Sequence, residues 1–152
     1  SGRAVVLVRQ LPKNAPFRVR VGCQTRKGSD AMVKGVAVRK KNQDSFAALL
    51  PYSRGKRAEE WTSFFGVYDG HGKDGHSVSL FVNQAVANRL RKLLRSMEPT
   101  EALAHSVAAA NDDLKRCRRI DSHVSGSTGV MVLQVGTDLY CCNVGDSRCV
   151  LG

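Results

Sequence analysis

Two periods of hydrophobic positions divide the chain into strand-like and helix-like parts. The stretch PFRVRVG, residues 16–22, alternates apolar and arginine positions, which is the period-2 pattern of a half-buried strand. We predict further strands at MVKGVAVRK (32–40), SFAALL (45–50) and WTSFFGVYD (61–69), of which the last is the most apolar. Glycine and charged residues between these runs predict turns and loops. The N-terminal part of the chain is therefore predicted to be β-structure.

After residue 75 the apolar positions recur at steps of three and four, which is the period of an amphipathic helix. The first stripe covers residues 78–97, with basic residues off the stripe, and Pro99 marks its end. A second stripe covers residues 103–114, with Thr100 as the predicted N-cap. We therefore predict two consecutive helices in the middle of the chain.

The C-terminal part returns to strand patterns. STGVMVLQV (127–135) and DLYCCNV (138–144) flank a Gly136-Thr137 turn, which predicts a β-hairpin. GDSRCVLG (145–152) then predicts another turn and another strand. The order of strands, two helices and strands favours an α+β fold of mainly antiparallel sheets over a repeating βαβ fold.

Composition sets the class of protein. The 152 residues are enough for one domain with a hydrophobic core, and the hydrophobic fraction of 42% is ordinary. No apolar run reaches the ~20 residues of a membrane helix. Five cysteines without a CxxC pair indicate reduced thiols and a cytoplasmic or nuclear protein. Because the chain begins with Ser1-Gly2, we expect a piece of a longer protein, with residues 1–20 as a peripheral segment.

The formal net charge of +11 predicts anionic partners, such as phosphorylated or acidic proteins or nucleic acid. The basic residues gather in four clusters, at 39–41, 54–57, 89–95 and 115–119. Aromatic residues make up only 6% of the chain, and no basic run is interleaved with residues that could stack on bases. Nucleic-acid binding is therefore the weaker interpretation of this charge.

Candidate chemistry begins where the most apolar strand ends, in FFGVYDGHG (64–72). A carboxylate at the end of a buried strand, Asp69, can bind a hard cation, which prefers oxygen ligands. Gly70 lets the backbone approach closely, so its carbonyl could supply a second oxygen. His71 would then lie within reach of a bound group and could transfer a proton near neutral pH. Taken alone, however, DGHG is as typical of a plain turn.

A second acidic motif, NQDSF (42–46), places Asp44 at the head of a strand and five residues after Arg39. Asp44 and Asp69 could share a cation, and the planar guanidinium of Arg39 could hold an anion. A cation, an arginine and a histidine together indicate a phosphate-ester site. The alternative is that Asp44 caps a turn while Arg39 is solvated.

Four motifs, NQDSF, FFGVYDGHG, SGSTGVMVL and NVGDSRCVL, occur in the order seen in the type 2C metal-dependent protein serine/threonine phosphatases. From about Val21 to its end, the sequence resembles the N-terminal part of that catalytic domain. The resemblance implies two packed antiparallel β-sheets flanked by helices, a β-sandwich core, of which residues 1–152 would supply only the N-terminal half.

The resemblance also implies a role for each candidate residue. Asp69 would bridge two Mn²⁺ or Mg²⁺ ions, and the carbonyl of Gly70 would bind one of them. Asp44 would support the metal site, often through water. Arg39 would hold the phosphate of a phosphoserine or phosphothreonine protein substrate. His71 would protonate the leaving serine or threonine oxygen.

The remaining motifs have smaller expected roles. We expect the polar residues of SGST (125–128) to bond buried backbone or shape a turn. GDSR (145–148) is expected to form a tight turn, although some relatives place a third metal near the aspartate that Asp146 resembles. Gln43 stands where many relatives have glutamate, which should weaken a contact behind the metal site. Three histidines match no family position and are expected to be surface or helix residues: His76, His105 and His123.

The sequence departs from the family mainly in its incomplete set of metal ligands. The family has further aspartates in later DG and DN segments, and neither segment occurs in these 152 residues. Two carboxylates cannot neutralise the four positive charges of two divalent ions. We therefore expect weak Mn²⁺ binding, little or no activity of this chain, and exposed sheet surface that favours self-association. The alternatives are a pseudophosphatase or interaction module and, after it, a binder of anions or nucleic acid.

Overall fold

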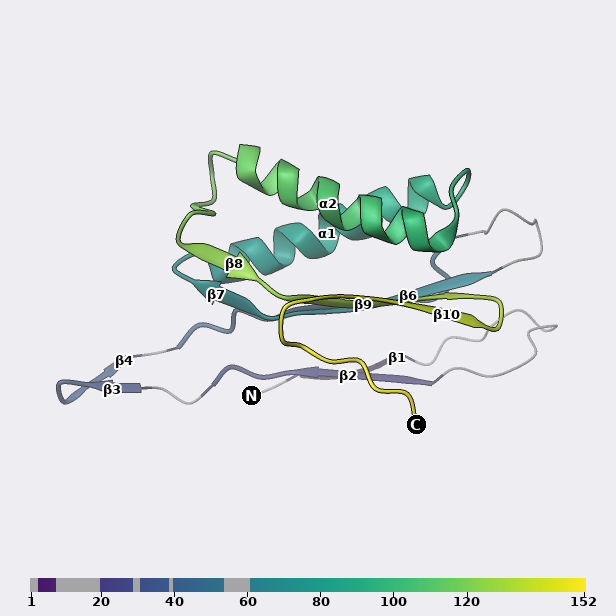
Figure 1. Cartoon of the computed structure of the whole chain (residues 1–152). Coiled ribbons are helices and arrows are strands. Elements are labelled where there is room, and N and C mark those ends of the chain that lie inside the picture. Colours follow the sequence, from purple (N-terminus) through teal and green to yellow (C-terminus); the bar gives the residue numbers. More distant parts are fainter. Residues whose placement is uncertain (1–2, 8–19, 29–30, 39, 54–60) are drawn as a thin grey trace.

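The computed structural model describes residues 3–7, 20–28, 31–38, 40–53 and 61–152. Figure 1 shows the layers: two helices cover one face of a four-stranded sheet, and a two-stranded sheet lies on the side of the opposite face. All the pairings between strands are antiparallel. The expected α+β fold of antiparallel sheets flanked by helices is confirmed.

The four-stranded sheet has the order β10-β9-β6-β5. Its strands are β5 (Ser45–Leu49), β6 (Thr62–Tyr68), β9 (Gly129–Val135) and β10 (Asp138–Val144). β6 is central because it pairs with β5 along one edge and with β9 along the other, and most of its residues are buried. The two strands predicted at 45–50 and 61–69 and the predicted hairpin of β9 and β10 are thereby confirmed.

Three two-stranded sheets complete the described β-structure. They pair β1 (Arg3–Leu7) with β2 (Val21–Thr25), β3 (Ala31–Val33) with β4 (Val36–Val38), and β7 (Gly70–Gly72) with β8 (Ser125–Ser127). β2 contacts β5, which joins the first of these sheets to the main sheet. The strands β1, β7 and β8 were not predicted from the sequence.

Two predicted strands are wrong in the described residues. The stretch 32–40 is split by Lys34 and Gly35, which have φ angles of 50° and 78° and form a turn between β3 and β4. The stretch 145–152 forms no strand. The strand predicted at 16–22 lies mostly outside the described residues, and within them β2 begins only at Val21.

The helices are α1 (Gly75–Leu93) and α2 (Pro99–Arg116). α2 begins earlier than predicted, and its N-cap is Glu98 rather than Thr100. Pro99 is the first residue of α2, where its fixed φ suits a helix and its missing N–H has no partner to lose. The proline that was expected only to end the first helix therefore starts the second. Neither helix is long and apolar enough to cross a membrane.

The hydrophobic core lies between the helices and the main sheet. Phe64 and Tyr68 from β6, Leu90 from α1, and Leu133 from β9 are fully buried there. The ring of Phe64 stacks on Tyr52 with centroids 5.2 Å apart. Apolar burial of this kind is the main favourable contribution to folding.

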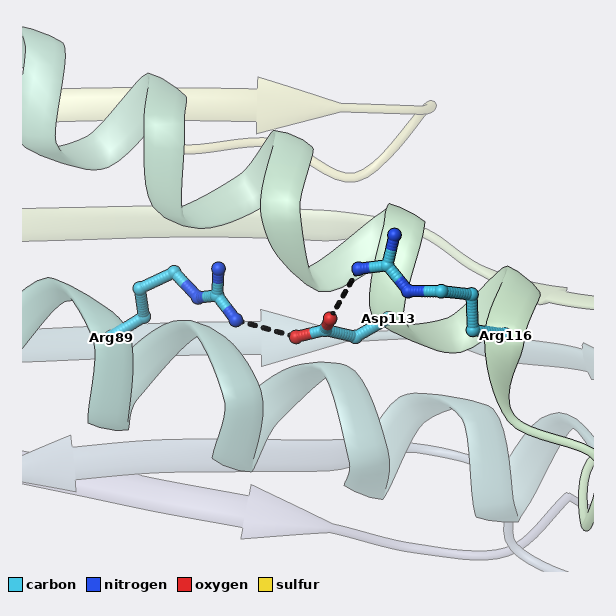
Figure 2. A network of polar contacts seen from close by, with 3 residues as sticks. All are labelled: Arg89, Asp113 and Arg116. Atoms are coloured by element: carbon cyan, nitrogen blue, oxygen red, sulfur yellow. Dashed lines mark hydrogen bonds and ion pairs between the residues drawn. The ribbon is translucent and has the colours of Figure 1, made fainter.

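An ion-pair network also joins the two helices (Figure 2). An Nη atom of Arg89 in α1 lies 2.5 Å from a carboxylate oxygen of Asp113 in α2. Arg116, three residues further along α2, lies 2.7 Å from the other oxygen. Both arginine side chains thus bind one carboxylate, which is only partly exposed.

Candidate functional site

The candidate site begins where β6 leaves the core. Tyr68, the last residue of β6, is fully buried, whereas Asp69 is exposed. Gly70 is buried again and His71 is exposed, so the backbone keeps the alternation of a strand. The two candidate side chains, Asp69 and His71, are therefore exposed on either side of a buried glycine.

Asp44 and Asp69 meet because β5 and β6 are antiparallel neighbours. Ser45, the first residue of β5, pairs with Tyr68, the last residue of β6. The residue before β5 and the residue after β6 therefore lie side by side at the same end of this strand pair. Strand pairing alone brings together two aspartates that are far apart in the sequence.

The ionisation of Asp44 reflects this proximity. Partial burial is the largest cause that raises the pKa of the Asp44 carboxyl above its ordinary value, followed by the charge of Asp69 and a side-chain hydrogen bond to Asp69. Two carboxylates that repel each other are the arrangement that a bound cation relieves. Within the described part of the chain, no group of three or more His, Cys, Asp or Glu side chains could hold a metal ion.

The backbone of Asp69 is held by Thr128. The Asp69 N–H donates to Oγ1 of Thr128 at 3.1 Å, and the Thr128 N–H donates to the Asp69 carbonyl at 2.8 Å. Oγ1 of Thr128 also lies 2.7 Å from Oγ of Ser147, in the GDSR segment. Thr128 therefore joins the candidate metal ligand to the turn that follows β10.

The rest of the loop is held by the same SGST segment. Ser125 accepts a hydrogen bond at 2.9 Å from the N–H of Asp74, the N-cap residue of α1. The Asp74 carbonyl in turn accepts from the N–H groups of Ser77 at 2.8 Å and Val78 at 3.0 Å in the first turn of α1. The expectation that the polar residues of SGST bond backbone groups is confirmed.

Gln43 connects the NQD segment to the loop. Its side-chain Nε2 donates to the carbonyl of Gly72 at 2.6 Å, and its own carbonyl accepts from Oγ of Ser79 at 2.6 Å. An ionised glutamate has no hydrogen to donate, so it could not make the contact with Gly72. Gln43 therefore makes a hydrogen bond that the glutamate of many relatives could not make. The sequence analysis did not foresee this bond.

Gly70 has a packing role that the sequence analysis did not foresee. A Cβ atom there would lie 2.5 Å from the carbonyl oxygen of Gln43 and would also clash with the carbonyl of Gly75. The missing side chain thus makes room for the backbones of the NQD segment and of α1. Whether the Gly70 carbonyl binds a metal stays a prediction.

His71 lies over β8. It pairs with Gly126, and a Cβ atom at position 126 would come within 2.5 Å of the His71 Nε2 atom. Any larger residue at that position would displace the imidazole. Gly126 therefore leaves room for the ring, a role that the sequence motif SGST did not reveal.

The other predicted residues are placed as follows. Arg39 lies outside the described residues, so its phosphate-binding role stays a prediction. Asp146 is exposed in the turn after β10. His105 and His123 are exposed and His76 lies in helix α1, as expected, where it is half-buried. Its Nε2 atom lies 2.7 Å from the ammonium of Lys41, which links α1 to the basic segment before Asp44.

Comparison with known proteins first defines the class, which is that of the protein phosphatases. The family model for protein phosphatase 2C matches residues 29–152. The chain therefore belongs to the protein phosphatase 2C family.

Several relatives carry the family name. "Probable protein phosphatase 2C 64" of Oryza sativa subsp. japonica is 40% identical over 94 residues, which are 57% of this chain and 22% of that protein. "Probable protein phosphatase 2C 72" of Arabidopsis thaliana is 36% identical over 140 residues, 84% of this chain and 40% of that protein. "Protein phosphatase 2C homolog 2" of Schizosaccharomyces pombe is 34% identical over 113 residues, which are 72% of this chain and 30% of that protein. The chain thus spans between about a fifth and two fifths of their lengths.

Proposed function

We propose that this chain is part of a Mn²⁺- or Mg²⁺-dependent phosphatase that removes phosphate from phosphoserine and phosphothreonine in proteins. The observation that supports this most directly is the proximity of Asp44 and Asp69 at one end of the paired strands β5 and β6. Membership of the protein phosphatase 2C family supports the reaction class.

Asp44 and Asp69 fit a hard divalent cation because they supply carboxylate oxygens that otherwise repel each other. In the proposed site Asp69 would be a direct ligand, the Gly70 carbonyl a second ligand, and Asp44 a supporting group. When bound, the metal would supply Lewis-acid activation of a water molecule for attack on phosphorus.

The protein's own residues would handle the substrate. Arg39 would bind two oxygens of the substrate phosphate through its planar guanidinium. His71 would donate a proton to the serine or threonine oxygen as it leaves, which suits an imidazole near neutral pH. Gly126 would keep the His71 ring in place, because its missing side chain leaves room for the ring.

We further propose that this chain binds the metal weakly and has little activity by itself. Two divalent ions carry four positive charges, whereas Asp44 and Asp69 supply two negative ones. The described residues offer no cluster of three acidic or histidine ligands. A fully active site would therefore draw further carboxylates from outside the described residues.

The test is hydrolysis of a phosphothreonine peptide with and without Mn²⁺, with Asp69→Asn as the control. Mn²⁺ binding, measured by calorimetry on both proteins, provides a readout that does not need turnover. We expect weak Mn²⁺ binding that Asp69→Asn abolishes, and turnover close to background. Binding that is unchanged in Asp69→Asn would contradict the proposed metal site, and vigorous turnover would contradict the proposal of weak activity.

A second candidate is a pseudophosphatase or interaction module, in which the fold is kept without complete metal chemistry. It is supported by the same lack of a three-residue ligand cluster in the described part of the chain. The calorimetric experiment separates the two candidates, because a pseudophosphatase need not bind Mn²⁺ through Asp69.

A further inference from the structure

The β3–β4 hairpin stands apart from the rest of the molecule. In Figure 1 it extends beyond the main sheet, at the end where β7 and β8 lie. Its apolar side chains are strongly exposed: 70% for Met32, 54% for Val33, 65% for Val36 and 46% for Val38. Contiguous exposed apolar residues of this kind are typical of interaction sites.

The hairpin nevertheless has the geometry of a well-formed ribbon. Its turn has positive φ at both central residues, 50° at Lys34 and 78° at Gly35, which matches the twist of the two strands. Val33 pairs with Val36, and Val38 pairs with Ala31. Paired residues share a face, so the three valines lie on one face of the ribbon.

The edges of the hairpin are open. Within the described residues, β3 and β4 pair only with each other, so each strand has one unpaired edge. A two-stranded ribbon alone is marginally stable in water, and a third strand would both bond an edge and cover the valines. Addition of an extended peptide to such an edge is a common mode of recognition.

The charge around the hairpin selects the kind of peptide. Residues 20–43 include seven basic residues and a single acidic one, Asp30. Lys34 lies at the tip of the hairpin and Lys41 follows it toward the candidate site. An acidic partner is therefore favoured by attraction over the whole segment.

The hairpin is also close to the candidate site along the chain. Asp44 comes six positions after Val38, a span of at most about 22 Å when fully extended. A peptide that lay along the hairpin could therefore present a residue to Asp44 and Asp69 after a short spacer.

We propose that the β3–β4 hairpin is a docking arm for an extended acidic and apolar segment of the phosphoprotein substrate. The segment adds to the hairpin as a third strand, its apolar side chains cover Val33 and Val36, and its carboxylates face Lys34. This inference rests on the proposed function for the identity of the partner, but docking itself needs no metal and no turnover.

The first test uses a labelled peptide of alternating glutamate and valine, followed by a short spacer and a phosphothreonine. Fluorescence anisotropy measures its binding to the whole chain without metal. We expect Val33→Thr/Val36→Thr to weaken binding roughly tenfold, about 1.4 kcal/mol, because threonine keeps the strand but removes apolar contact. The matched control, Leu139→Thr/Val150→Thr, also removes two exposed apolar residues and should leave binding unchanged.

The second test separates charge from folding. Lys34→Asn removes the charge at the tip, while asparagine is better suited than lysine to positive φ. We expect binding to fall several-fold and to depend less on salt, although the hairpin is kept. A peptide with lysine in place of glutamate should not bind to the unmodified protein.

Three results would decide the matter. Equal binding by the unmodified protein and by both hairpin variants would overturn the proposal. A shift in oligomeric state with Val33→Thr/Val36→Thr, without any change in peptide binding, would also overturn it, since a second copy would then occupy the hairpin. Hairpin-dependent peptide binding in a protein that fails the Mn²⁺ test would support docking while refuting the phosphatase proposal.

Discussion

The middle and the C-terminal end of β6 are held in different ways. The middle is buried among apolar side chains, where Phe64 belongs to the core shared with the helices and β9. Its C-terminal end leads into Asp69, whose backbone N–H donates to Thr128 and whose carbonyl accepts from Thr128. Apolar burial is strong but has little direction, whereas hydrogen bonds fix the direction of a group. The core thus supplies stability, and the polar contacts set the geometry of the site.

The largest expected effect is in the core. Phe64→Ala should lower the free energy of unfolding by about 3–5 kcal/mol, because it removes a fully buried ring and leaves a cavity. Urea unfolding measures the loss. Val67→Ala on the exposed side of the same strand is the control and should change the free energy of unfolding by about 0.5 kcal/mol or less. Similar losses in both variants would contradict the assignment of the core to one face.

Gly70→Ala tests the backbone packing of the site. The added methyl would overlap the carbonyls of Gln43 and Gly75, and backbone atoms cannot move aside as a side chain can. We expect a loss of about 2–3 kcal/mol in the free energy of unfolding, together with loss of Mn²⁺ binding. Gly22→Ala is the matched control, since a Cβ atom there has no neighbour within 4 Å. If Gly70→Ala were as stable as Gly22→Ala, the close approach of the three backbone segments would be wrong.

Thr128→Val tests the link between β9 and Asp69. Valine keeps the shape of threonine but leaves the Asp69 N–H without its acceptor, which should cost about 1–2 kcal/mol of unfolding free energy. Mn²⁺ affinity should fall with it if Asp69 is a ligand. Thr128→Ser keeps the hydroxyl and should restore most of both quantities. A loss in the serine variant as large as that in the valine variant would contradict the prediction, because the methyl group would then contribute as much as the hydroxyl.

Sequence patterns predicted the parts of the fold that depend on burial. The period of the apolar residues was enough to place β5, β6, β9, β10 and both helices, because a buried face must repeat with the period of its element. The turn at Lys34 was missed because lysine is not a residue typical of positive φ, so only Gly35 pointed to it. The start of α2 was missed because Pro99 was interpreted only as a helix terminator.

The site could be predicted as far as its motifs, but not its contacts. Asp44 and Asp69 could be paired in advance because each flanks a strong strand pattern. The bonds of Gln43 to Gly72 and of Thr128 to Asp69 join residues 29 and 59 positions apart. No local pattern encodes such contacts, since they depend on how β7 and β8 pair. The contact of Lys41 with His76 was missed for the same reason.

The smallest expected effect belongs to the network of Figure 2. A side-chain hydrogen bond from Arg116 is the largest cause that holds the pKa of Asp113 below its ordinary value. Desolvation opposes it, and the charges of Arg89 and Arg116 add to the lowering. Because the folded pKa is the lower one, the stabilisation is present above the ordinary value near 3.8 and is lost as pH falls through the folded pKa.

Asp113→Asn should therefore reduce the acid-dependent loss of stability below that value, measured by thermal unfolding over pH. Asp112→Asn, a change at the exposed neighbour on α2, is the control. Salt should weaken the effect of Asp113→Asn, because exposed ion pairs are screened. An effect that salt does not change would point to packing of the Asp113 side chain between the helices rather than to its charge.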